Sequence, residues 1–144
     1  MRTVHEMLAG KGRDVWSVRP DASVFDALRL MADKNIGAVL VVDAGGTLAG
    51  ILSERDYARK VILRGVTSKD TPVSAIMTEH VVCIPPETTL EACMALMTDR
   101  HIRHLPVTEG SRPIGIVSIG DVVRAVIENQ GFVIAQLHQY ITRG

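Results

Sequence analysis

The sequence is poor in cysteine and contains no long hydrophobic run. Its two cysteines, Cys83 and Cys93, have neither a CxxC partner nor neighbouring metal ligands, and both lie in apolar runs. This pattern predicts buried thiols in a protein from a reducing compartment. No segment approaches about 18 uninterrupted apolar residues, and no apolar stretch of signal-peptide length follows Met1, so we expect a soluble cytoplasmic protein.

The sequence also lacks a net charge. Its 16 Lys and Arg residues balance its 16 Asp and Glu residues, so no overall field attracts the protein to nucleic acid or to an anionic membrane. The basic cluster Arg100–Arg103 alone suggests a polyanion, which leaves nucleic acid as the least favoured partner. The hydrophobic content of 47% is ample for a core and predicts folding without disulfides.

Sequence signatures of catalysis are missing as well. There is no GxxxxGK phosphate loop, no G-x-S-x-G elbow at Ser53 or Ser118, and no recurring set of metal ligands. His5, His80 and His138 are scattered and form no metal-binding pattern. We therefore expect a protein that is not an enzyme and that holds neither a metal nor a catalytic cofactor.

What the sequence does contain is an internal repeat. The segment Gly50–Asp56, GILSERD, returns 65 residues later as Gly115–Asp121, GIVSIGD, and upstream of this motif the offset is 66. A period of this length is typical of tandem supersecondary units. We predict repeat 1 over residues 1–66, repeat 2 over residues 67–130 and a helical tail over residues 131–144.

Both repeats show the same order of predicted elements: a short turn, a strand, a helix, two strands and a second helix. The helices follow the i, i+3, i+4, i+7 spacing of one buried face, and the strands are rich in β-branched residues. The matching pairs are Val4–Leu8 and Val73–Met77, Val15–Val18 and Val81–Ile84, Val24–Met31 and Leu90–Met97, Ala38–Val42 and His104–Val107, Gly50–Leu52 and Gly115–Val117, and the helices that open at Ser53 and Ser118.

These elements predict an α/β (α+β) fold in which two β-α-β-β-α repeats are related by a pseudo-twofold axis. Pro106 in the second hairpin predicts a strand edge, because proline offers no amide to a ladder. After Glu128, apolar residues at positions 133, 134, 137, 140 and 141 predict a C-terminal amphipathic helix that caps the molecule or contacts a second chain.

The repeated motif Gly-apolar-apolar-Ser-x-x-Asp lies at a strand-to-helix junction and has two interpretations. In the first, Ser53 and Ser118 are helix N-caps. Asp56 and Asp121 then complete capping boxes and complement the helix dipole. In the second, the free amides and the hydroxyl at the helix start bind a phosphate, while the carboxylate accepts hydrogen bonds from ribose hydroxyls. Both roles can coexist in one junction.

The duplicated motif, together with the hairpin segment Leu105–Val107, resembles a known family, the tandem CBS-domain pair or Bateman module. The resemblance extends from about Val4 to Ile127. It implies a non-catalytic regulatory module that binds an adenosyl nucleotide (AMP, ADP, ATP, NAD or S-adenosylmethionine) in two clefts between the repeats. It also implies a homodimer, in which four repeats form a disc, and a regulated protein partner.

The resemblance further implies which residues touch the nucleotide. It assigns the ribose to Asp56 and Asp121. It assigns the phosphate-side hydroxyl to Ser53 and Ser118. The adenine pocket that it implies consists of Trp16, Ser17, Val18, Val82, Cys83 and Ile84. For Trp16 the favoured alternative is a core residue between the repeats, because large aromatic side chains more often fill a core.

The two predicted clefts differ in their cations. Arg55 within the first motif and Lys60 on the following helix supply positive charge that phosphates favour. The second motif has Ile119 and Gly120 at the corresponding place. The second cleft is therefore expected to borrow its cations from elsewhere in the chain.

Four other basic residues are candidates for anion binding. Arg103 and His104 lie on the approach to the second hairpin strand, where comparable family members place phosphate contacts. A solvated helix end is an equal alternative for both, because cations are favourable at a helix C-terminus. Arg59 and Arg124 recur at one position of the repeat, and surface ion pairs are the favoured interpretation for them.

A second function of a different class fits the same sequence. If the clefts are empty or vestigial, the helix faces alone bind a target and the chain is a protein-interaction adaptor. In the regulatory interpretation, a ligand that bridges both repeats shifts a partner equilibrium by its differential affinity for the two arrangements. The response of the melting temperature to adenosyl ligands separates the two functions.

Overall fold

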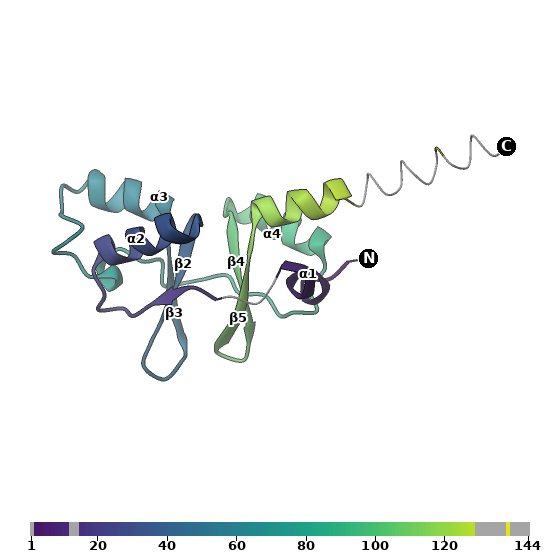
Figure 1. Cartoon of the computed structure of the whole chain (residues 1–144), viewed down its shortest axis with the longest axis horizontal. Helices are drawn as coiled ribbons and strands as arrows, with labels where there is room; N and C mark the ends of the chain where they lie inside the picture. Colours follow the sequence, from purple (N-terminus) through teal and green to yellow (C-terminus); the bar gives the residue numbers. More distant parts are fainter. Residues whose placement is uncertain (1, 12–14, 129–137, 139–144) are drawn as a thin grey trace.

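The computed structural model describes residues 2–11, 15–128 and 138. Two halves lie side by side, each with a small sheet and with helices along one side of the molecule (Figure 1). The predicted mixed fold with two similar units is confirmed. The tail helix predicted over residues 131–144 lies outside the described residues, apart from His138. Within the described part of the chain, no helix is both long and apolar enough to cross a membrane.

The first half contains a three-stranded sheet. Its strands are β1 (Ser17–Val18), β2 (Ala38–Val42) and β3 (Leu48–Ser53), with β1 parallel and β3 antiparallel to the central β2. The apolar run of β2 is confirmed as a strand, and its first four residues are buried. The second half contains the antiparallel pair β4 (His104–Glu109) and β5 (Arg112–Ser118).

The strand predicted over Val81–Ile84 is wrong. Only Ile84 pairs, through a single bridge parallel to Val107. Pro85 follows at once and has no amide for a ladder, so the pairing does not extend. The carbonyl of Pro106 accepts a hydrogen bond from Ile84 N at 3.0 Å, so this proline faces the short bridge and its missing amide costs the β4–β5 ladder nothing.

The two long helices are α2 (Val24–Lys34) and α4 (Leu90–Arg100). Their N-caps are Ser23 and Thr89, each of which accepts a backbone N–H three residues on, at 3.1 and 3.2 Å. Both helices end in a residue with a left-handed backbone, φ 54°. The predicted helical stripes are confirmed; their fully buried members are Val24, Ala27, Met31, Leu90, Cys93 and Met97.

The helices that follow the repeated motif differ between the halves. In the first half a single α-helical turn, α3 (Glu54–Asp56), continues as the π-helix η1 (Tyr57–Ile62). In the second half, residues 119–128 form a regular α-helix. Both begin directly after the serine of the motif, as predicted.

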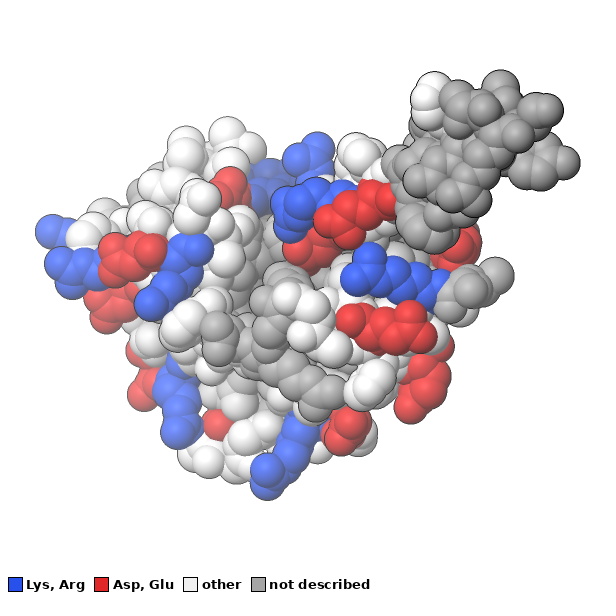
Figure 2. Space-filling model, turned by 45° about the vertical axis from the view of Figure 1, so that its right-hand side comes forward, with Lys and Arg blue, Asp and Glu red and all other residues white. Residues whose placement is uncertain are grey.

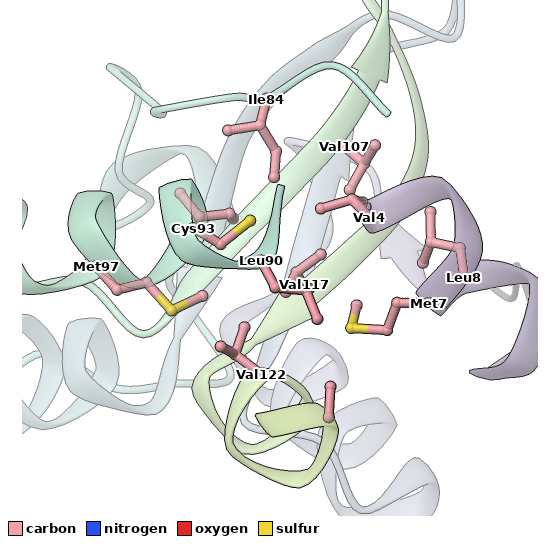
Figure 3. Close-up of a cluster of buried hydrophobic side chains, with 12 residues drawn as sticks. Val4, Met7, Leu8, Ile84, Leu90, Cys93, Met97, Val107, Val117 and Val122 are labelled. Carbon is pink, nitrogen blue, oxygen red and sulfur yellow. The ribbon is translucent and has the colours of Figure 1, made fainter. Parts of the chain in front are cut away.

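The helix at the start of the chain belongs to the core of the second half. It is α1 (Val4–Lys11), and Val4, Met7 and Leu8 are buried against residues of the second half (Figure 3). The amide of Val4 also donates to Thr88 O at 2.8 Å. The first predicted turn therefore serves the second repeat.

The matching segment of the second repeat completes the core of the first half. Val73, in the short 3₁₀ helix η2 (Val73–Ala75), and Ile76 are buried in the first core. Val73 N donates to Ala22 O at 2.8 Å. The predicted boundary between residues 66 and 67 separates the two copies of the sequence motif but not the two cores. Each core contains one segment from the other repeat, Val4–Leu8 in the second core and Val73–Met77 in the first, and we call these the exchanged segments.

The glycine of the repeated motif lies where each exchanged segment crosses a strand. A Cβ placed on Gly50 would be 2.7 Å from Thr78 O and 2.9 Å from Met77 Sδ. A Cβ on Gly115 would be 2.8 Å from Leu8 Cδ1. Gly50 is therefore required by a backbone oxygen that cannot easily move, whereas a side chain at Gly115 would require the end of the Leu8 side chain to shift.

A third buried cluster joins the two sheets. Its buried residues are Ala38, Leu40 and Ile51. The partly buried apolar residues packed around it come from both halves: Val15, Val42, Leu48, Val81 and Ile116. The two halves therefore share an apolar interface in addition to the exchanged segments.

Two predictions about burial are wrong. Cys83 is exposed, whereas Cys93 is buried, because Cys83 lies in an irregular segment rather than in a strand. Trp16 does not fill the core. It is 38% exposed, and Lys34 Nζ lies 4.3 Å from its ring centroid, so a cation covers one face of the indole.

We expect Gly50→Ala to lower the free energy of unfolding by about 1–3 kcal/mol, because the added methyl group meets a backbone oxygen. The control is Gly10→Ala in α1, where a Cβ would meet nothing closer than Arg2 Nη2 at 4.0 Å. That change should raise the free energy of unfolding by up to about 1 kcal/mol through helix propensity. Urea unfolding measures both, and equal effects would contradict the close crossing at Gly50.

The two thiols should react very differently with a disulfide reagent in the native protein. Burial and the nearby Glu91 raise the pKa of Cys93 to about 11, and desolvation raises the pKa of Cys83 above its ordinary value. We expect one thiol, that of Cys83, to be labelled at pH 8, at a rate that still increases above pH 9 as the thiolate forms. Cys83→Ala should abolish this labelling, and equally fast labelling of both thiols would contradict the burial of Cys93.

Candidate functional site

The first junction of the repeated motif is a capping box. Ser53, the last residue of β3, accepts the amide of Asp56 on its Oγ at 3.2 Å, and its own amide donates to Asp56 Oδ2 at 3.0 Å. The capping interpretation is therefore confirmed here. The ribose role of Asp56 and the phosphate role of Ser53 stay predictions.

The carboxylate of Asp56 also holds the exchanged segment. Its Oδ1 accepts from Thr78 Oγ1 at 3.1 Å and lies 3.2 Å from Lys60 Nζ. Lys60 in turn donates to Ile76 O at 2.9 Å. The ammonium group of Lys60, which was predicted to attract a phosphate, is thus paired within the protein with Asp56, a carboxylate that is 8% exposed.

The second junction repeats the cap with different neighbours. Ser118 N donates to Asp121 Oδ2 at 2.9 Å, and Asp121 N donates to Ser118 Oγ at 3.1 Å. Arg124 Nη2 lies 2.7 Å from Asp121 Oδ1, and its side chain is 68% exposed. The ion-pair interpretation of Arg124 is confirmed, whereas its counterpart Arg59 is exposed on η1.

Two predicted phosphate residues each approach a residue of the other repeat. Arg55 Nη1 donates to His101 O, at the end of α4, at 2.8 Å. The ring of His104 lies 3.5 Å from the position that a Cβ on Gly37 would take, and Glu54 Oε1 lies 3.9 Å from the same position. Gly37 is thus the point at which the first motif meets the start of β4.

Arg103 belongs to the other junction. Its carbonyl accepts the amide of Ile119 at 2.8 Å, just as Gly37 O accepts the amide of Glu54 at 3.0 Å. The side chain of Arg103 is exposed and that of His104 is half-buried. Both residues therefore adjoin the second motif through their backbones, since His104 pairs with Ser118, and the ring of His104 approaches Gly37 of the first repeat.

A cavity of ≈ 340 Å³ lies beside the first junction. Its walls are Leu28, Met31, Ala32, Asn35, Ile36, Gly37 and Glu54. Ligand pockets in proteins have volumes of roughly 300–1,000 Å³, so this cavity is at the lower end of that range. It combines an apolar wall from α2 with a carboxylate from the motif, and all of its lining residues belong to the first repeat.

The predicted adenine segments occupy corresponding places in the two halves. Ser17 and Val18 form β1 and pair with β2, while Ile84 pairs with β4. Val82 is partly buried against the second core, and Cys83 is exposed. Each segment therefore lies beside the strand that precedes the hairpin turn.

Sequence reasoning missed three residues of these junctions. Thr78 lies 22 residues from Asp56 and is brought to it only by the exchange of segments. Gly37 directly precedes the predicted strand Ala38–Val42, and Glu54 lies within the repeated motif, but nothing in the sequence indicated that either residue lines a cavity. Their only signal was position, since Gly37 precedes β2 as Arg103 precedes β4.

The surface carries no dominant charge on the face that Figure 2 shows. Basic and acidic side chains are interspersed there, in agreement with the balanced composition. Among residues 2–11, 15–128 and 138, no group of three or more His, Cys, Asp and Glu side chains is placed to hold a metal ion.

Comparison with known proteins identifies the repeat. The model of the CBS domain family matches residues 12–63 and 73–128. The CBS domain-containing protein CBSX3, mitochondrial, of Arabidopsis thaliana is 42% identical over an alignment of 151 positions, which covers 99% of this chain and 73% of that protein. Another Arabidopsis relative, CBSCBSPB5, is much longer, and its match of 37% identity covers 69% of this chain and 18% of that protein.

Solved structures agree with the sequence relatives. A protein with CBS domains from Burkholderia ambifaria has 48% identity and a TM-score of 0.84, over 90% of this chain and 96% of that one. The hexameric CBS-CP12 protein from bloom-forming cyanobacteria has 29% identity and a TM-score of 0.75, over 85% of this chain and 70% of that one. The present chain therefore belongs to the CBS-domain family and carries two CBS domains in tandem.

Proposed function

We propose that this chain is a regulatory module that binds an adenosyl nucleotide, such as AMP, ATP or NAD, in clefts between its two CBS domains. CBS-domain proteins are regulatory, non-catalytic modules. No catalytic role and no metal or catalytic cofactor is proposed for the chain. We further propose a cytoplasmic location, although the Arabidopsis relative is named mitochondrial.

The observation that carries this proposal is the meeting of both repeats around Gly37. Arg55 of the first motif donates to His101 O of the second repeat, and the ring of His104 lies 3.5 Å from the Cβ position of Gly37, a residue that lines the cavity of ≈ 340 Å³. A guanidinium and an imidazole suit a phosphate. A phosphate at this place would contact both repeats at once, and a ligand shared between two units stabilises one arrangement of them.

The ribose would be bound by the buried carboxylates. Asp56 and Asp121 are 8% and 6% exposed, respectively, and are fixed in place by their capping boxes. In the first cleft, a ribose diol has to replace Thr78 or Lys60 on Asp56 Oδ1. Such an exchange keeps the carboxylate satisfied in both states, which a buried charge requires.

A second function, the protein-interaction adaptor, is supported by the same contacts. Asp56 is fully used by Ser53, Lys60 and Thr78, so the first junction is complete as a structural element. In that case the clefts bind nothing and a regulated protein is contacted by the helices alone. A ligand screen decides between the two functions.

We expect AMP, ATP or NAD to raise the melting temperature. At a free concentration a hundredfold above Kd, binding adds about 2.7 kcal/mol, which corresponds to roughly 5–15 °C for a domain of this size. Asp56→Asn and Asp121→Asn should each weaken the affinity about tenfold or more, because a charged hydrogen-bond acceptor is lost. Differential scanning fluorimetry across a concentration series measures both quantities.

Lys60→Met is the matched control for Asp56→Asn. It removes the same ion pair and lowers the melting temperature of the free protein, but it leaves the carboxylate for the ribose. The ligand-induced rise should therefore persist in Lys60→Met. Loss of that rise in both variants would assign Asp56 a structural role, and the absence of any rise in the wild type would favour the adaptor.

We also propose a homodimer formed through the helical side of the molecule. Ile119, Val123 and Ile127 recur every four residues on the helix over residues 119–128 and are 39%, 46% and 60% exposed. This helix lies on the same side as α2 and α4 (Figure 1). Among the relatives, the CBS-CP12 protein is hexameric, and a second copy of the chain is the partner whose apolar stripe matches this one.

Val123→Lys should reduce the subunit count measured by light scattering after gel filtration, because a charge is then placed in the centre of the apolar stripe. The control is Val66→Lys, at a residue that is 42% exposed and lies outside the helices. This variant should keep the wild-type mass. An unchanged mass for Val123→Lys would place the interface on another surface.

A further inference from the structure

Arg55 makes a hydrogen bond that reaches across the two repeats. Its Nη1 donates to His101 O at 2.8 Å, between residues 46 positions apart in the sequence. His101 is the C-cap of α4, with a left-handed backbone at φ 54°. The carbonyls at a helix C-terminus carry partial negative charge, so the guanidinium is favourably placed at the end of α4.

The other junction lacks this contact for a reason visible in the sequence. The residue that corresponds to Arg55 in the second motif is Gly120, which has no side chain. The cap that corresponds to His101 is Asn35, with the same left-handed backbone. The second junction therefore forms without a hydrogen bond of this kind, so the bond from Arg55 to His101 O is not needed for the junction to fold.

The same guanidinium is the cation of the first motif. Arg55 is exposed, so a ligand can reach it without unfolding the junction. Arginine presents several donors in a planar fork that matches a phosphate, and a hydrogen bond between two charged groups is stronger than one to a neutral carbonyl. A phosphate in the first cleft that engages Nη1 would therefore compete with His101 O for this donor.

We propose that Arg55 is a latch between the first cleft and the end of α4. Without ligand it holds His101 O; with a phosphate-bearing nucleotide it turns to the phosphate and releases that carbonyl. This inference rests on the proposed function of the first cleft. It implies that adenosine, which has no phosphate, binds without releasing the latch, so the module responds to phosphorylated ligands only.

The released segment leads to the surface proposed for self-association. His101 N and Ile102 N both donate to Met97 O, which closes the end of α4. The next residue, Arg103, accepts the amide of Ile119 at 2.8 Å. Loosening the segment after α4 therefore acts on the first turn of the helix over residues 119–128, which carries the exposed apolar stripe.

Amide hydrogen exchange measured by NMR tests the latch. AMP should increase the exchange rates of the His101 and Ile102 amides about 2- to 12-fold, the loss expected for one ordinary hydrogen bond. Adenosine should leave these rates unchanged. Arg55→Met should increase them to a similar extent without ligand, and AMP should then have no further effect.

Arg64→Met, which removes another exposed arginine after η1, is the control and should behave as the wild type does. If AMP raises the melting temperature but leaves the two exchange rates unchanged or lowers them, the latch is overturned and the proposed function survives. Unchanged rates in Arg55→Met without ligand also overturn the latch. If neither AMP nor any other adenosyl ligand changes the melting temperature, the proposed function falls and the latch with it.

Discussion

The structure depends on the close crossing of two exchanged segments over two strands. At Gly50 the crossing chain comes so near that its Thr78 oxygen would lie 2.7 Å from a Cβ, and at Gly115 the crossing side chain is that of Leu8, at 2.8 Å. Around each crossing a separate core closes, with α1 in one and η2 in the other. Gly50 is therefore a packing requirement, Gly115 accommodates the side chain of Leu8, and the Ser-x-x-Asp that follows each glycine is held by its own capping bonds.

The motif combines structural and chemical roles in the same atoms. Asp56 caps a helix through one oxygen and, through the other, fixes the exchanged segment by Thr78 and pairs with Lys60. A buried carboxylate with several donors is stable as it stands. It is also a site at which one donor can be traded for another without leaving a charge unpaired. This explains how a residue needed for folding can also serve a ligand in the proposed function.

The fold could be predicted from local patterns, whereas the site depends on contacts between distant residues. The apolar stripes of α2 and α4, the buried run of β2 and the caps at both motifs were all readable because their partners lie within a few positions. The packing of α1 in the second core could not be predicted in this way, because the apolar stripe of a helix indicates which face is buried but not which element covers that face. The predicted burial of Cys83 and Trp16 was wrong for a related reason, since apolar neighbours in the sequence do not ensure burial of a residue outside a regular helix or strand. The contact of Arg55 with His101 O has no sequence signal at all.

The exchange of segments also sets an order of events for a chain made from its N-terminus onward. The first half cannot close its core until residues 73–77 have been synthesised, and α1 has no core to join until β4 and β5 exist. Domains that emerge early during synthesis ordinarily fold as units. Here the first core has all of its residues once residue 77 has been made, whereas the apolar face of α1 stays uncovered until β4, β5 and the helix over residues 119–128 have followed, so the two halves close one after the other.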